Sequence, residues 1–121
     1  MPLQSYRELI VWQKSVDLVA EAFLVARHLP RDQVYGLAIQ LQRAAVSVPA
    51  NIAEGNGRRH RAEYVHHLSI ARGSLNETEA LLHVCARLGY LNAAQIAAAI
   101  GFCDEVSRLL TVLCRPLSNS S

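Results

Sequence analysis

The sequence has no apolar run long enough to span a membrane. Its longest uncharged stretch extends from Leu88 to Cys103 and is interrupted by Asn92 and Gln95, so it is too short and too polar to cross a bilayer. The N-terminal segment has charges within its first apolar stretch and lacks the residue order of a secretory signal. These absences predict a cytoplasmic protein with no membrane partner.

The sequence also has few cysteines and a small net charge. The three cysteines, an odd number without a Cys-x-x-Cys pair, fit neither a disulfide framework nor a four-cysteine zinc site. We interpret Cys85, Cys103 and Cys114 as buried free thiols. Twelve basic residues nearly balance ten acidic ones, giving a net charge of +2, yet eleven of the twelve are arginine. Arginine suits bidentate contacts with phosphates and carboxylates, so charge alone leaves the partner open.

Helical periodicity is the strongest signal that is present. Of the 121 residues, 51% are hydrophobic and 18% are charged, which is enough apolar content for one core and predicts a single domain over residues 1–121. Apolar residues recur three and four positions apart in four segments. We predict helices near residues 6–28, 32–55, 61–88 and 93–115, with a frayed tail at 116–121.

Local residues mark the expected helix ends. Ser5 with Glu8, and Asn92 with Gln95, have the spacing of capping boxes. The second helix should start after Asp32, and Gly89 suits the residue that follows the third helix. Pro49 should kink the second helix and not end it, because the stripe resumes in phase. The stripe expected to face the core in the first helix is Leu9, Trp12, Val16, Val19, Phe23 and Ala26.

No segment shows the alternation of a half-buried strand. Four helices with three-four spacing and short connections predict an all-α, left-handed, up-down-up-down four-helix bundle.

Candidate catalytic and metal-binding residues are few. His60, Glu63 and His67 have a spacing that could place three ligands on one helical face. We favour a solvated or interface histidine face, because the Gly- and Arg-rich residues before His60 leave its helical state uncertain. No serine or cysteine has a recognisable catalytic frame, and the one glycine-rich stretch lacks a preceding strand. We therefore predict no enzyme, no cofactor and no metal.

Arg58, Arg59 and Arg61 form a basic run between the second and third helices. Helix N-termini attract anions, so this run is the candidate nucleic-acid site. Glu54 and Glu63 flank the run and reduce the net charge over residues 54–64 to +1. Intramolecular ion pairs in a solvated loop therefore remain the alternative.

Arg43 and Arg72 lie among small residues, where arginine often reaches a buried carboxylate or a neighbouring subunit. Glu54, Glu63 and Glu77 are the candidate partners. Gly73 lies within the third predicted helix, where glycine costs about 1 kcal/mol relative to alanine. Its presence indicates a close approach, either by another helix of the bundle or by another subunit.

Six motifs are distributed over nearly the whole chain. They are LIVWQK at residues 9–14, Tyr35-Gly36-Leu37, QLQRAAVSVPANIAEG at residues 40–55, Glu63-Tyr64, LSIARGSL at residues 68–75, and LGYL at residues 88–91. Together they resemble one family, the four-helix-bundle proteins encoded in intervening sequences of bacterial 23S ribosomal RNA genes. Members of that family commonly have Ser or Thr where this chain has His60, so the capping box with Glu63 is missing here.

The resemblance implies a bundle that assembles as a homopentamer without an assigned enzymatic activity. The family is also distantly similar to the accessory protein of diversity-generating retroelements, a pentameric bundle that binds nucleic acid and a reverse transcriptase. We therefore expect a non-enzymatic oligomeric scaffold that engages RNA, DNA or a nucleic-acid-bound protein. The alternative is a protein–protein adaptor without nucleic-acid contact.

Overall fold

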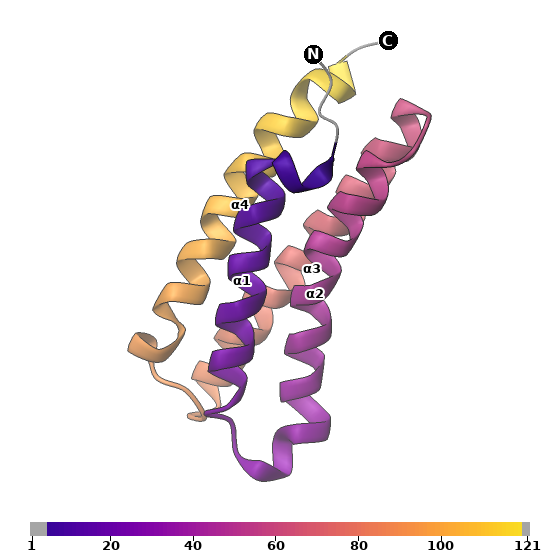
Figure 1. The fold of residues 1–121 in the computed structure, drawn as a ribbon. Coiled ribbons are helices and arrows are strands. Elements are labelled where there is room, and N and C mark those ends of the chain that lie inside the picture. The colour runs from indigo at the N-terminus through magenta and orange to yellow at the C-terminus, as the bar shows by residue number, and fades with distance from the viewer. Residues whose placement is uncertain (1–4, 120–121) are drawn as a thin grey trace.

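Four long helices make up the fold. The computed structural model describes the backbone of residues 5–119 and the side chains of residues 5–117, and no strand occurs in that part of the chain. Consecutive helices run in opposite directions, and each packs against two others, α1 and α3 both contacting α2 and α4 (Figure 1). The predicted all-helical four-helix bundle is confirmed. The helices are α1 (Ile10–Ala26), α2 (Ile39–Asn56), α3 (Arg61–Arg87) and α4 (Ala93–Asn119).

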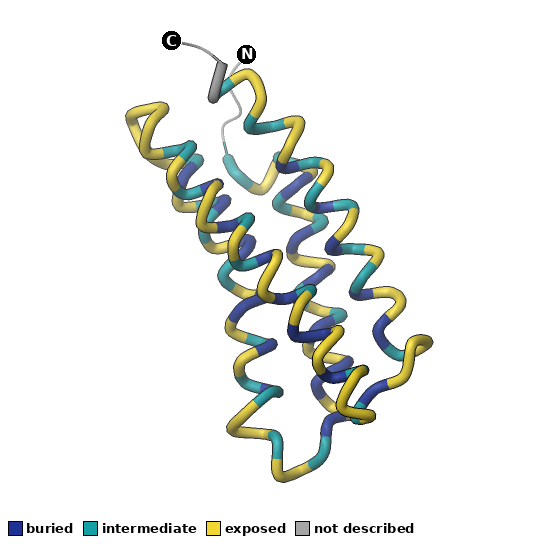
Figure 2. The backbone as a smooth tube through the Cα atoms, turned by 180° about the vertical axis from the view of Figure 1, so that it is seen from behind, coloured by how far each residue is buried: buried dark blue, intermediate teal, exposed yellow. Residues whose placement is uncertain are grey.

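The core runs along the inner side of all four helices (Figure 2). The apolar residues that recur three and four positions apart in α3 and α4 are buried along most of both helices, including Leu68 and Leu82 on α3 and Val106 and Leu110 on α4. Each such side chain contributes about 1.5–3 kcal/mol by leaving water. Three-four apolar periodicity therefore identified the core faces of these two helices.

The stripe predicted as the core face of α1 is only partly covered by the rest of the chain. Ala26 is buried, and Leu9, Trp12 and Val19 are partly buried against the core, but Val16 and Phe23 remain 38% and 40% exposed. The buried residues of α1 are Val11, Ser15, Leu18, Ala22, Val25 and Ala26. Helix α1 is thus apolar on two neighbouring faces, and the chain itself covers the second of them only in part.

The start of the second helix also differs from the prediction. Asp32 lies in a short 3-10 turn, Arg31–Gln33, and makes no capping bond. A π-helical turn follows at Val34–Ala38, with Gly36 outside helical geometry at φ −112° and ψ −108°. Regular α2 then begins at Ile39 and continues through Pro49 to Asn56. The helix therefore passes Pro49 without ending, as expected.

Some of the other predicted helix ends are confirmed and some are not. Ser5 caps only a 3-10 turn, Tyr6–Glu8, and Leu9 is extended, so α1 starts later than predicted. Gly89 ends α3 with φ 82°, a conformation that costs glycine little. Asn92 and Gln95 exchange the two capping-box bonds, at 2.8 and 2.9 Å. The fraying expected from residue 116 is wrong as far as Asn119, because α4 continues through Pro116; residues 120–121 lie outside the described part.

Candidate functional site

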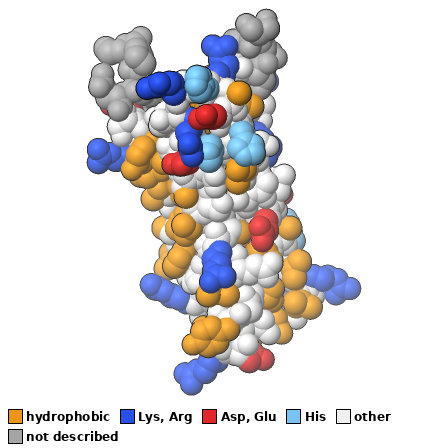
Figure 3. Space-filling model, turned by 90° about the vertical axis from the view of Figure 1, so that its right-hand side faces the viewer, with side chains coloured by type: hydrophobic (Ala, Val, Ile, Leu, Met, Phe, Trp, Pro, Cys, Tyr) orange, Lys and Arg blue, Asp and Glu red, His pale blue; other side chains and the backbone are white. Residues whose placement is uncertain are grey.

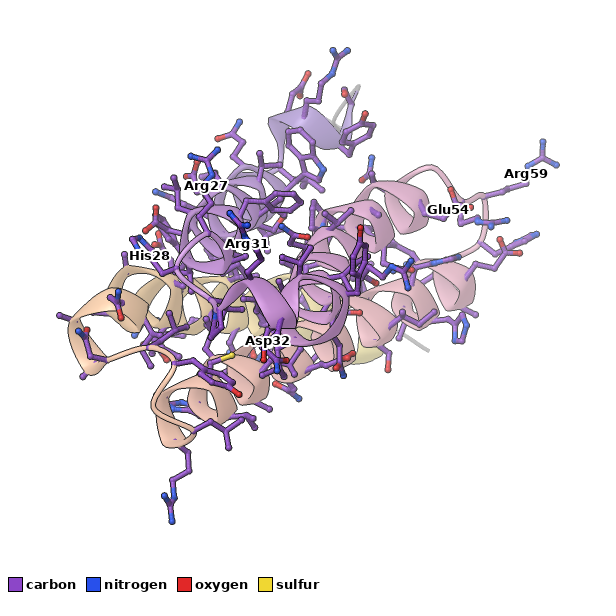
Figure 4. The ribbon with its side chains drawn as sticks, turned by 90° about the horizontal axis from the view of Figure 1, so that it is seen from below. Arg27, His28, Arg31, Asp32, Glu54 and Arg59 are labelled. Atoms are coloured by element: carbon purple, nitrogen blue, oxygen red, sulfur yellow. The ribbon has the colours of Figure 1, made fainter. Side chains whose placement is uncertain are left out.

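The basic run lies at the end of the bundle where α2 turns into α3. Arg58, Arg59 and Arg61 are all exposed there. Basic and histidine side chains gather at this end, with acidic side chains among them (Figure 3). Arg59 points away from the bundle (Figure 4) and has no hydrogen bond or ion pair within residues 5–117. The Arg59 side chain is therefore open to solvent at this end.

Arg58 is already engaged within the chain. Its guanidinium donates to Glu54 across one helical turn, at 2.6 Å. Both side chains are about half exposed, at 43% and 55%, so the pair stabilises the fold by less than about 1 kcal/mol. A bound phosphate could displace such a weak pair, although Glu54 would still reduce the local positive potential.

A close contact between α2 and α3 positions this turn. An alanine Cβ at Gly55 would lie 2.8 Å from His67 Cβ and 3.0 Å from Tyr64 Cδ1. The Tyr64 hydroxyl donates to Asn56 Oδ1 at 3.3 Å, and His67 Nδ1 bonds Asn51 Oδ1 at 3.1 Å. His60 precedes α3 without a side-chain cap, as its sequence predicts.

The two arginines expected to reach a carboxylate do not do so in the described chain. Arg72 extends from α3 to α4, where it donates to Ser107 Oγ at 3.1 Å, Ser107 O at 3.2 Å and Thr111 Oγ1 at 2.8 Å. Arg72 therefore links two helices of one subunit. Arg43 is exposed and has no hydrogen bond or ion pair with any residue whose side chain is described.

Gly73 does not mark a close approach within the bundle. A Cβ at Gly73 would meet nothing within 4 Å, so the intramolecular interpretation of this glycine is wrong. The subunit-contact interpretation stays a prediction. The close approach occurs at Gly55, which the sequence had suggested only as part of a helix terminus.

An apolar groove runs between α1 and α2. Two adjoining hollows, of about 300 and 380 Å³, lie along it and share Val46, which is 43% exposed. The partly exposed stripe of α1 forms one wall and the outer side of α2 forms the other. The apolar groove residues are Tyr6, Trp12, Val16, Val19 and Phe23, together with Ile39, Val46, Pro49, Ala50 and Ala53. Three polar residues, Gln42, Arg43 and Ser47, also line the second hollow.

The three cysteines are free thiols, and none of them lines the groove. Cys85 and Cys103 are buried free thiols, as predicted, and Cys114 is half-buried. Burial, with a smaller contribution from Glu79, raises the pKa of Cys103 to about 12. Burial also raises the pKa of Cys85, and that of Cys114 despite the opposing Arg72 charge. These groups are protonated near neutral pH, so they are poor nucleophiles.

Within residues 5–119, no helix is long and apolar enough to cross a membrane. The same part of the chain holds no cluster of three or more His, Cys, Asp or Glu residues suited to a metal ion. His60, Glu63 and His67 therefore do not come together as ligands.

The geometry defines a helical bundle with three exposed arginines at the turn between α2 and α3 and a partly apolar groove between α1 and α2. Residues 7–112 match the model of the 23S rRNA-intervening sequence protein family, and the chain belongs to that family. The fold is similar to the 1.70 Å crystal structure of a protein of unknown function from the S23 ribosomal protein family of Bacteroides thetaiotaomicron VPI-5482. That structure is 26% identical, covers 88% of this chain and 99% of its own, and gives a TM-score of 0.80. No curated protein is similar enough to count as a match.

Proposed function

We propose that this protein is a non-enzymatic scaffold that assembles from several copies and binds RNA or DNA phosphates at its basic end, without sequence specificity. The observation that carries the proposal is the second apolar face of α1, on which a single chain leaves Val16 and Phe23 exposed. A helix that is apolar on several sides is normally buried on all of them.

The groove between α1 and α2 is the surface that we assign to self-association. Val16, Phe23 and Val46 are each about 40% exposed along it, and contiguous exposed apolar surface commonly marks a protein contact. The family resemblance implies five copies. A pentamer would carry about +10 in total, and it would bring five basic ends into one assembly.

A charge placed in the groove should dissociate the assembly. We expect Val46→Glu to reduce the native mass to that of the 13.3 kDa monomer, because association would bury an unpaired carboxylate. Val84→Glu on α3 is the matched control, since Val84 is 42% exposed and lies outside the groove. Native mass spectrometry measures the assembly. A wild type that is monomeric at micromolar concentration contradicts the proposal, and so does a Val46→Glu variant that remains assembled.

The basic end should dominate nucleic-acid affinity. We expect the Arg58→Ala, Arg59→Ala, Arg61→Ala triple variant to bind RNA and duplex DNA more weakly than wild type. The slope of log affinity against log salt should fall by roughly 0.7–0.9 for each phosphate that the variant no longer binds, measured across about 50–200 mM salt. Unrelated sequences should bind equally, because phosphate contacts carry no base information.

The opposite end of the bundle supplies the control. Arg27, Arg31 and Arg87 are exposed there, and Figure 4 views that end with Arg27 and Arg31 labelled. Replacing these three with alanine removes the same charge, so the affinity should fall less than in the first triple variant. Equal losses of affinity in the two triple variants would mean that only net charge matters. An unchanged affinity of the first triple variant would show that the basic run is not the site.

A protein–protein adaptor without nucleic-acid contact is the second candidate function. The Glu54–Arg58 ion pair favours it, because one of the three arginines already has a carboxylate partner at 2.6 Å. Wild-type protein that assembles but binds neither RNA nor DNA at low salt would support the adaptor over the nucleic-acid scaffold.

A further inference from the structure

A third hollow lies between α2 and α3, beside the π-helical turn, and has a volume of about 420 Å³. It adjoins the groove between α1 and α2, with which it shares Ile39, Arg43 and Ser47. It is separate from the basic end, because Arg43 and Arg58 lie fifteen residues apart on α2 and its turn, about 22 Å at the rise of a helix. The volume suits a small molecule. Polar groups that line it are Gln40, Arg43, Ser47, Ser74 and Glu77.

Two opposite charges line this hollow without neutralising each other. Arg43 on α2 and Glu77 on α3 form no ion pair with each other, and neither has a hydrogen bond within the part of the chain whose side chains are described. Gln40 is likewise without a partner there. The hollow therefore offers a guanidinium, a carboxylate and an amide with a net charge of zero, which is complementary to a dipolar ligand more than to an anion.

The serines add one hydrogen-bond donor. Ser74 Oγ donates to Ser47 Oγ at 2.8 Å, and Asn51 Nδ2 donates to the same Ser47 oxygen at 3.0 Å. Both acceptor sites of Ser47 are then occupied, while its own hydroxyl proton has no acceptor among the described side chains and backbone. If the serine pair is reversed, the spare proton belongs to Ser74. In either arrangement one hydroxyl donor remains at the hollow.

The remaining walls are apolar. Ile39 and the buried Ala44 come from α2, and Tyr35 stands at the rim with 91% of its surface exposed. Tyr35 and Gly36 belong to the turn Val34–Ala38, in which Gly36 leaves helical geometry. An exposed aromatic ring beside free charges is suited to contact the apolar part of a ligand.

We propose that this hollow binds a small zwitterion of the α-amino-acid type with an apolar or aromatic side chain. Arg43 and the spare serine hydroxyl take its carboxylate, Glu77 and the Gln40 carbonyl take its ammonium group, and Tyr35 with Ile39 contacts its side chain. Arginine favours carboxylates through paired donors. The proposal does not depend on nucleic-acid binding.

The test uses two zwitterions, L-leucine and L-phenylalanine, and two leucine derivatives that each lack one of the two charges, N-acetyl-L-leucine and L-leucinamide. By calorimetry, we expect the two amino acids to bind wild type with Kd near or below about 1 mM. N-acetylation removes the ammonium charge and amidation removes the carboxylate, so each should weaken binding about tenfold or more.

Two variants test which residue binds each charged group of the ligand. Arg43→Gln should bind leucine and leucinamide equally, and Glu77→Gln should bind leucine and N-acetyl-leucine equally. Arg108→Gln is the control, since Arg108 pairs with Asp104 on α4 at 3.2 Å, and it should bind as wild type does. No binding of either amino acid at about 10 mM, or unchanged discrimination in both variants, overturns the proposal. If wild type binds no amino acid and the variants change the native mass, the proposal is overturned. That result would identify the hollow as a contact between copies.

Discussion

Gly55→Ala should destabilise the protein by about 1–2 kcal/mol, although alanine is the better helix former. The added Cβ would lie 2.8 Å from His67 Cβ and 3.3 Å from the Tyr64 carbonyl oxygen. Neither atom is the free end of a flexible side chain, so α2 and α3 must separate. Overpacking costs about 1–3 kcal/mol, and a contact of 2.8 Å between two Cβ atoms belongs in the upper half of that range. Subtracting the gain of about 1 kcal/mol in helix propensity leaves a net loss of about 1–2 kcal/mol.

Gly73→Ala is the matched control and should have the opposite sign. Its Cβ would meet nothing within 4 Å, so the helix gain of about 0.5–1 kcal/mol remains uncompensated. Urea unfolding of both variants at one protein concentration measures the difference, because assembly makes stability depend on concentration. A neutral Gly55→Ala contradicts the close contact. A Gly73→Ala protein that loses native mass would instead identify Gly73 as part of a subunit contact.

The bundle was predictable where one signal determined each feature. Leu68, Leu82 and Leu110 are apolar on a single helical face, and that face can only point inward. Asn92 and Gln95 cap α4 through bonds between residues three apart, so no tertiary information is needed to foresee them. Gly89 is similar, because its positive φ follows from the end of the helix that it terminates.

The phase of α1 was not predictable from periodicity, because that helix has two apolar stripes. Trp12, Val16 and Phe23 share a face with the same spacing as Val11, Leu18 and Ala22. Only packing against α2 and α4 decides which stripe is buried. The π-helical turn before α2 is comparable, since Gly36 interrupts a pattern that would otherwise support a helix from Asp32.

The sequence predicted where the candidate site residues lie better than it predicted which of them already have a partner. The sequence located Arg58, Arg59 and Arg61 at a turn, and the flanking Glu54 signalled that an ion pair could form. It did not reveal that Arg72 bonds Ser107, because that contact joins residues 35 positions apart. The hollow between α2 and α3 was missed for the same reason: Arg43 and Glu77 line one surface only after the helices pair.

Alkaline pH should destabilise the fold, with Cys103 as the largest single cause. Its thiol is 1% exposed, and its pKa rises from 9.0 to about 12 because burial disfavours the thiolate. The folded state therefore holds this proton more tightly than the unfolded state does. The resulting stabilisation is fully present below about pH 9 and is lost as the pH rises toward 12, by up to about 1.4 kcal/mol per pH unit.

Cys103→Val should flatten this dependence, because valine fills a similar volume and does not ionise. We expect the variant and wild type to have similar unfolding free energies at pH 7, and the variant to be the more stable of the two above pH 10 in reductant. Cys85, Cys114 and Tyr64 also have raised pKa values, so some alkaline loss should persist in the variant. Urea unfolding between pH 7 and 11 measures the two curves, and identical slopes would contradict the assignment to Cys103. A folded wild type whose Cys103 reacts with a thiol reagent at pH 9 as fast as a free cysteine would contradict it as well, since a buried, protonated thiol must first be exposed by unfolding.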